Sequence, residues 1–149
     1  TRDFVTNVYL LEDPKEIIKT LDPLAFSTHI KDMGGKKYTD GFLLSEVPLG
    51  EGIVDVKAGV NLCRKLNPDL TFSLEMITRD PLKIPCLTED YWATFDEMKG
   101  VEFEKVMAMI ETNEFKTALP STSNLDSEGR LAFEEANVLE CLKYSRRVV

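Results

Sequence analysis

Two short segments that read as β-strands, each followed by charged residues, limit the possible folds of this chain. The first, residues 26–30, carries the only histidine, His29, and leads into a glycine-rich segment. The second, residues 70–74, is followed directly by Glu75. Residues 54–66, which separate them, place apolar side chains at helical spacing. This order predicts a strand–helix–strand unit, in which polar strand ends meet at the carboxyl edge of a parallel sheet. We therefore expect His29 and Glu75 to lie together at that edge.

Length, net charge and cysteine content limit the classes of protein to which this chain can belong. A chain of 149 residues suits one domain, and a complete (β/α)8 barrel needs about 250. The net charge of -8 argues against a nucleic-acid partner, which needs clustered Lys and Arg. We find neither a membrane-spanning run nor a signal peptide and expect no membrane partner. Cys63, Cys86 and Cys141 are widely spaced in apolar contexts, which predicts buried free thiols in a reducing compartment, the cytoplasm.

The rest of the pattern predicts more helices than strands. We expect helices over residues 15–21, 102–118 and 126–147, and we expect Asp55 to cap the helix between the two strands. Residues 33–52 and 79–95 are predicted to be long irregular connections, which at that length are usually functional. The chain starts without a methionine and runs at once into the expected end of a third strand. This start indicates a piece of a longer chain, and three parallel strands would leave an unpaired sheet edge.

An ordered set of segments carries a family resemblance. The segments are STHIKD at residues 27–32, VPLGEGIVD at residues 47–55 and LEMITRDP at residues 74–81, together with Asp3 and the LLEDP segment after it, and Glu135-Ala136-Asn137 through Tyr144. They resemble the C-terminal half of the sugar phosphate isomerase/epimerase family, which has the xylose-isomerase-like TIM-barrel fold. The resemblance spans essentially the whole chain. It implies one partial α/β domain over residues 1–149, containing about the last three βα units of a (β/α)8 barrel plus C-terminal helices.

The resemblance also implies a divalent metal site. Asp3, His29 and Glu75 match three of the family's four metal ligands, and the fourth, a Glu, would precede residue 1. Carboxylates with one imidazole suit Mn, Mg, Co or Zn. Glu75 also matches one of the two catalytic carboxylates that move a proton. Lys31 and Arg79 are candidates for binding a substrate phosphate or hydroxyl, with solvated charges as an equal alternative. A satisfied structural histidine and a turn-capping glutamate are the corresponding alternatives for His29 and Glu75.

The sequence therefore predicts a metal-dependent isomerase or epimerase of carbohydrate metabolism, acting on a small sugar or sugar phosphate through an enediolate. We expect it to need its N-terminal half, and to form a homo-oligomer or a complex with that half. One alternative is a non-catalytic truncated half-barrel that persists by self-association. Another, less favoured, is a metal hydrolase like the AP endonucleases, which need a basic DNA groove and further His, Asp and Glu ligands. The sugar, the metal and the choice between isomerisation and epimerisation stay open.

Overall fold

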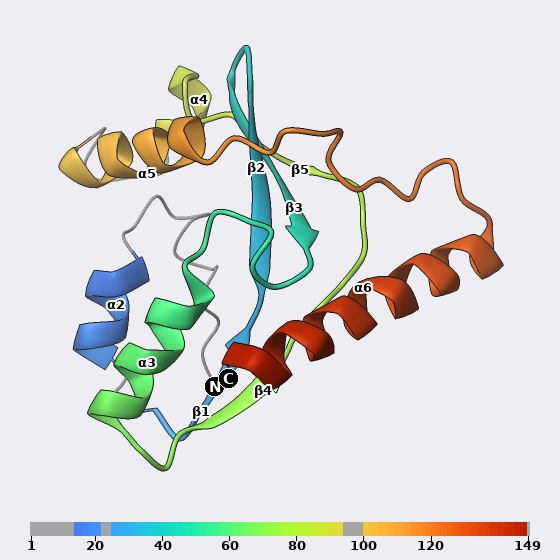
Figure 1. The fold of residues 1–149 in the computed structure, drawn as a ribbon. Coiled ribbons are helices and arrows are strands. Elements are labelled where there is room, and N and C mark those ends of the chain that lie inside the picture. Colours follow the sequence, from blue (N-terminus) through green and yellow to red (C-terminus); the bar gives the residue numbers. More distant parts are fainter. Residues whose placement is uncertain (1–13, 22–24, 94–99, 149) are drawn as a thin grey trace.

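Two small sheets and a set of surrounding helices make up the computed structural model, which describes residues 14–21, 25–93 and 100–148 (Figure 1). The strands β1 (Ser27–Ile30) and β4 (Thr71–Leu74) pair in parallel. The strands β2 (Asp32–Tyr38), β3 (Gly41–Val47) and β5 (Leu82–Ile84) form an antiparallel sheet in the order β2-β3-β5. The helices are α2 (Pro14–Leu21), α3 (Val56–Leu66), α4 (Glu89–Trp92), α5 (Val101–Thr112) and α6 (Ser127–Val148).

The predicted strand–helix–strand unit is present as β1, α3 and β4. Asp55 caps α3 by accepting a hydrogen bond from the Ala58 amide at 3.0 Å, as expected. The helix ends at Leu66, and its cap Asn67 precedes a proline. It buries one apolar stripe that includes Val60 and Cys63, whereas Leu66 is exposed. The unit therefore brings the carboxyl ends of β1 and β4 to one edge.

The connection expected over residues 33–52 is largely a β-hairpin, so this prediction is wrong. β2 and β3 pair in register from Asp32 opposite Val47 to Tyr38 opposite Gly41. Gly34 and Gly35, which favoured a loop, lie in β2 where other side chains approach the backbone. A Cβ on Gly35 would lie 2.6 Å from the Ile110 side chain of α5. Glycine in a strand commonly marks such a close approach.

The expected fold, a partial (β/α)8 barrel of about three βα units, is also wrong. In the described residues, only β1 and β4 are parallel, and the other three strands form a separate antiparallel sheet. The expected loop over residues 79–95 contributes β5 to that sheet and then the short helix α4. A barrel segment needs successive parallel strands joined by helices. Here the chain passes from β1 to β2 through one residue, Lys31, and changes sheet as it does so.

The two remaining predicted helices are present, with different bounds. α5 stops at Thr112 rather than continuing to residue 118, and the Asn113 amide closes it on the Met109 carbonyl. α6 follows Asp126, whose carboxylate accepts from the Gly129 amide at 2.8 Å. No helix in the described part of the chain is long and apolar enough to cross a membrane.

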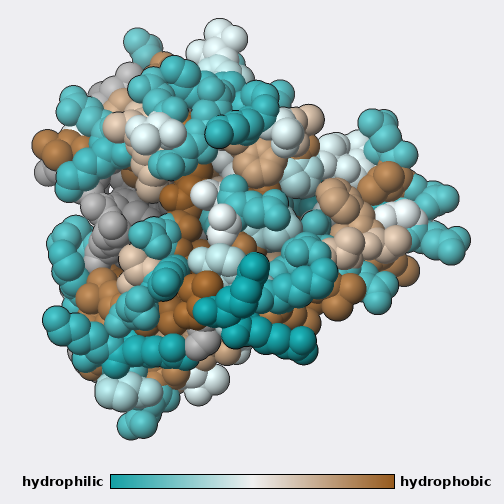
Figure 2. All heavy atoms as spheres, viewed as in Figure 1, coloured by the Kyte–Doolittle hydropathy of each residue, from teal (hydrophilic) through white to brown (hydrophobic). Residues whose placement is uncertain are grey.

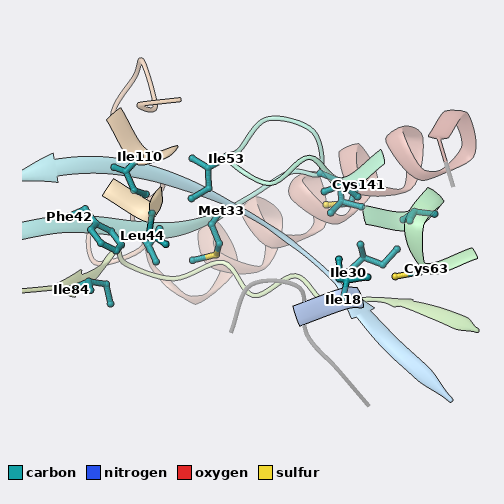
Figure 3. Close-up of a cluster of buried hydrophobic side chains, with 14 of the residues drawn as sticks. Ile18, Ile30, Met33, Phe42, Leu44, Ile53, Cys63, Ile84, Ile110 and Cys141 are labelled. Atoms are coloured by element: carbon teal, nitrogen blue, oxygen red, sulfur yellow. The ribbon is translucent and has the colours of Figure 1, made fainter. Parts of the chain in front are cut away.

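Buried apolar side chains join the two sheets. At one end, Ile18 of α2, Ile30 of β1 and Cys63 of α3 pack together (Figure 3). At the other end, side chains of the antiparallel sheet meet those of α5 and of the turn before α3; they include Met33, Phe42, Leu44, Ile53, Ile84 and Ile110 (Figure 3). All three cysteines are buried free thiols, as predicted.

The carboxylate of Asp32 holds the turn between β3 and α3 in place. It is buried and accepts four backbone hydrogen bonds, from Met33 at 2.8 Å, Gly50 and Gly52 at 2.9 Å, and Val54 at 3.0 Å. Burial raises the pKa of Asp32 to about 6, against the opposing effect of these four N–H donors. Local sequence does not indicate this role, because an acid before a glycine-rich segment is typical of a loop.

Glycines permit this close approach of the turn to Asp32. Gly50 has a φ of 86°, a left-handed conformation that glycine adopts without strain. A Cβ on Gly52 would lie 2.2 Å from the Asp32 carboxylate. The turn over residues 48–54 and the carboxylate thus fit each other only with glycine at these two places.

Replacing Asp32 by Asn tests this arrangement. The Asn amide would point its N–H groups at two backbone N–H donors, so two hydrogen bonds would be lost and two donors left buried. We expect the free energy of unfolding to fall by about 2–4 kcal/mol at pH 7.5. Urea denaturation measures it, with the exposed Glu51→Gln in the same turn as a control that should change stability little. A loss equal to that of the control would show that Asp32 does not hold the turn.

Candidate active site

His29 and Glu75 converge at the carboxyl edge of the parallel pair. His29 lies on β1, opposite Ser73 of β4, and Glu75 follows the last residue of β4. The Glu75 amide donates to the Ile30 carbonyl at 3.0 Å, which continues the strand pairing past β4. The His29 Nδ1 and a Glu75 carboxylate oxygen are 2.7 Å apart. The prediction that these two side chains meet at one strand edge is confirmed.

The ionisation of Glu75 decides where the proton of this hydrogen bond lies. Lys31 donates to the other Glu75 oxygen at 2.7 Å. The hydrogen bond from Lys31 lowers the pKa of Glu75 most; burial opposes it, and the bond with His29 lowers the pKa further. An ionised carboxylate can only accept, so Nδ1 of His29 must carry the proton. This leaves Nε2 of His29 as the nitrogen that can take up a proton, whereas a metal shared with Glu75 would have to displace the proton on Nδ1.

Lys31 is a buried cation between two carboxylates. Only 4% of it is exposed, and burial of a charge is costly unless the charge is paired. Its ammonium lies 2.7 Å from Glu75 and 3.9 Å from Glu46. Lys31 is therefore not the solvated charge considered as the alternative: it holds the Glu75 carboxylate, and its role in substrate binding stays a prediction.

Glu46 of β3, which was not predicted as a site residue, completes the cluster. Its side chain is fully buried and lies 3.1 Å from the Arg79 guanidinium. It also accepts a hydrogen bond from the Ile77 amide. Burial raises the pKa of Glu46, while that hydrogen bond and the charges of Lys31 and Arg79 lower it. The available signal was an acid within the apolar run FLLSEV, which is unusual for a strand with both faces covered.

Hydrogen bonds on both sides of Arg79 hold the segment after Glu75 in position. The Thr78 amide donates to Glu134 of α6 at 3.3 Å, and Asn137 donates to the Thr78 hydroxyl at 2.9 Å. Asp80 accepts from the hydroxyls and amides of residues 121–123, and these bonds hold its pKa well below its usual range. Arg79 is thus brought beside Glu46, with half of its side chain exposed.

The third predicted metal ligand, Asp3, lies outside the described residues. Among residues 14–21, 25–93 and 100–148, no group of three or more His, Cys, Asp or Glu is placed to hold a metal ion. His29 and Glu75 nevertheless offer suitable donors. Two neighbouring ligands of an octahedral ion, each about 2.1 Å from it, lie about 3 Å apart, which is close to the 2.7 Å found here. This pair alone supplies two donors, so the predicted metal site stays a prediction.

Comparisons with protein-family models, with curated proteins and with solved structures found no match to this chain. The case for a function therefore depends on the residues and their geometry.

Replacing Lys31 by Met tests whether it balances the two carboxylates. The variant would leave Glu46 buried with less compensating charge and free one oxygen of Glu75. We expect a loss of about 3–5 kcal/mol in the free energy of unfolding, against little change for Lys65→Met on the exposed face of α3. Combining Lys31→Met with Glu46→Gln should recover about 1 kcal/mol or more, because the unpaired buried charge is gone. Equal stability of the single and double variants would contradict the pairing.

Proposed function

We propose that this chain carries the acid–base part of a divalent-metal-dependent isomerase or epimerase that acts on a small sugar or sugar phosphate. The observation that supports it is the contact of His29 with Glu75 at the carboxyl edge of parallel strands, where their side chains are partly exposed. Both are residue types that such a reaction requires. A bound divalent ion would polarise the sugar carbonyl and stabilise the enediolate.

The residues of this chain would transfer the proton, keep the base charged and hold the metal. Glu75 is ionised and partly exposed, so it can accept a proton from the carbon beside a carbonyl and return it. Lys31 keeps Glu75 charged between these steps. His29 and Glu75 would hold the metal, together with Asp3 as the resemblance implies. Metal binding through Nδ1 of His29 would release the proton that now bridges to Glu75, so affinity should rise with pH.

A second candidate function uses the same pair without a metal. Glu75 holds Nδ1 of His29, the arrangement in which a carboxylate orients an imidazole base. Nε2 of His29 would then be the atom that takes the proton from the substrate. Chelation by EDTA distinguishes the two functions, because it abolishes activity under the first and leaves it intact under the second.

Solvent exchange of substrate protons tests the proposal. The chain, joined to the N-terminal half that the proposed reaction needs, is incubated with Mn2+ in 2H2O with D-fructose, D-ribulose and their phosphates, and NMR follows the proton next to the carbonyl. Glu75→Gln keeps size but loses basicity, so we expect exchange to fall at least about 100-fold. The exposed Glu104→Gln of α5 should exchange as the wild type does. Absence of exchange in the wild type with every sugar would overturn the proposed function.

We also propose that the chain associates with a second copy of itself through α6. Leu131, Leu139 and Leu142 lie on one side of this helix and are exposed, Leu131 by 71%. Figure 2 shows apolar residues among hydrophilic ones on the face of the molecule that it presents. A two-fold contact between equal stripes is the commonest way to cover such a surface.

Sedimentation velocity at micromolar concentration tests this association. A dimer is expected for the wild type, and Leu131→Lys should weaken it at least about 10-fold by placing a charge in the contact. Leu87→Lys, which changes an exposed leucine outside α6, should leave the dimer intact. A wild-type monomer at these concentrations would contradict the proposal.

A further inference from the structure

Glu46 connects the two sheets at the candidate site. It lies on β3, paired with Met33 in the antiparallel sheet. Its side chain reaches Lys31, the single residue between β1 and β2, and Arg79, which follows β4. A carboxylate from one sheet thus reaches two cations at the edge of the other.

Within the described part of the chain, an ionised Glu46 offsets charge on two neighbouring cations. Lys31 and Arg79 supply two positive charges, and Glu46 and Glu75 supply two negative ones. Without Glu46, Lys31 would lose the carboxylate that lies opposite Glu75 and would be held less firmly. With Glu46 present, the Lys31 ammonium is drawn from both sides and its position is defined.

We propose that Glu46 is a positioning residue for the His29–Glu75 pair. It fixes Lys31, Lys31 fixes one oxygen of Glu75, and the other oxygen is thereby directed at Nδ1 of His29. Glu46 also anchors the Arg79 guanidinium beside the same edge. That these contacts matter for a reaction rests on the proposed function. The contacts themselves can be tested without substrate.

The tautomer of His29 shows whether the contacts from Glu46 through Lys31 to Glu75 position the pair. His29 is the only histidine, so two-bond 1H–15N correlation spectra of the labelled protein show one imidazole, and its nitrogen shifts give the tautomer. At a pH where the ring is neutral, we expect the wild type to carry its proton on Nδ1. Glu46→Gln keeps the shape of the side chain and removes its charge. We expect it to lower the ratio of the Nδ1–H to the Nε2–H tautomer at least about three-fold.

Glu134→Gln is a matched control. Glu134 accepts from the Thr78 amide, and Glu46 accepts from the neighbouring Ile77 amide. Both glutamates therefore anchor the same segment, but Glu46 alone is also paired with Lys31. The tautomer ratio should stay at the wild-type value in Glu134→Gln. Equal changes in the two variants would show that Glu46 only anchors the backbone and would overturn the proposal.

Circular dichroism shows whether Glu46→Gln folds. If it does not, a second variant tests the proposal. Glu46→Asp keeps the charge but withdraws it from Lys31, and we expect a smaller shift of the tautomer ratio in the same direction. A wild-type ratio in the folded Asp variant, or in the folded Gln variant, would overturn the proposal. The proposed function fails separately, through absence of proton exchange in the wild type, and that result leaves the His29 spectra unaffected.

Discussion

The buried carboxylate of Asp32 fixes the point at which the chain leaves β1 and enters the hairpin. Its four backbone hydrogen bonds join the start of β2 to the turn before α3. Lys31 and His29 precede it on the same short stretch, so the bonds that hold Asp32 also limit where these two side chains can lie. The turn leads directly into α3, and α3 leads to β4 and Glu75. One buried acid therefore links the geometry of both strands that carry the candidate site.

Charge balance explains how a cluster so rich in ionised groups can be buried. A lone carboxylate such as Glu46 would lose several kcal/mol of hydration. Lys31 and Arg79 offset part of that cost, and the Ile77 amide offsets more. Replacing such groups by apolar ones of the same shape often leaves a protein equally stable. Their presence is therefore better explained by the definite position they give to Glu75 than by stability.

Several features could be predicted because they depend on short-range signals. Helical spacing and a capping acid located α3, and the polar residues after two apolar runs placed His29 beside Glu75. Two other features depend on contacts between distant segments. Gly34 and Gly35 look like loop residues until Phe115, Leu119 and Ile110 are known to pack against them. The resemblance suggested continuation of parallel strands, whereas the chain turns into an antiparallel hairpin directly after β1.

Glu46 and Asp32 escaped prediction for a related reason. A buried acid is recognised by its partners, and here these come from other parts of the chain: the turn over residues 50–54 for Asp32, and Lys31, Ile77 and Arg79 for Glu46. Local sequence shows only an acid near a glycine-rich stretch and another within an apolar run. Only the tertiary contacts give these acids a structural role.

The placement of the hairpin has a consequence for the order of folding. β2 and β3 are joined by two residues, so this pairing closes a very short loop. His29 and Glu75 are 46 positions apart in the chain, and closing a flexible loop of that length costs about 3 kcal/mol of chain entropy. The hairpin and α3 lie inside this loop and shorten it once they form. We therefore expect hairpin contacts in the transition state and the β1–β4 pairing after it, which φ-values at Phe42 and Phe72 would measure. The candidate site would be the last part of the molecule to assemble and the first to come apart.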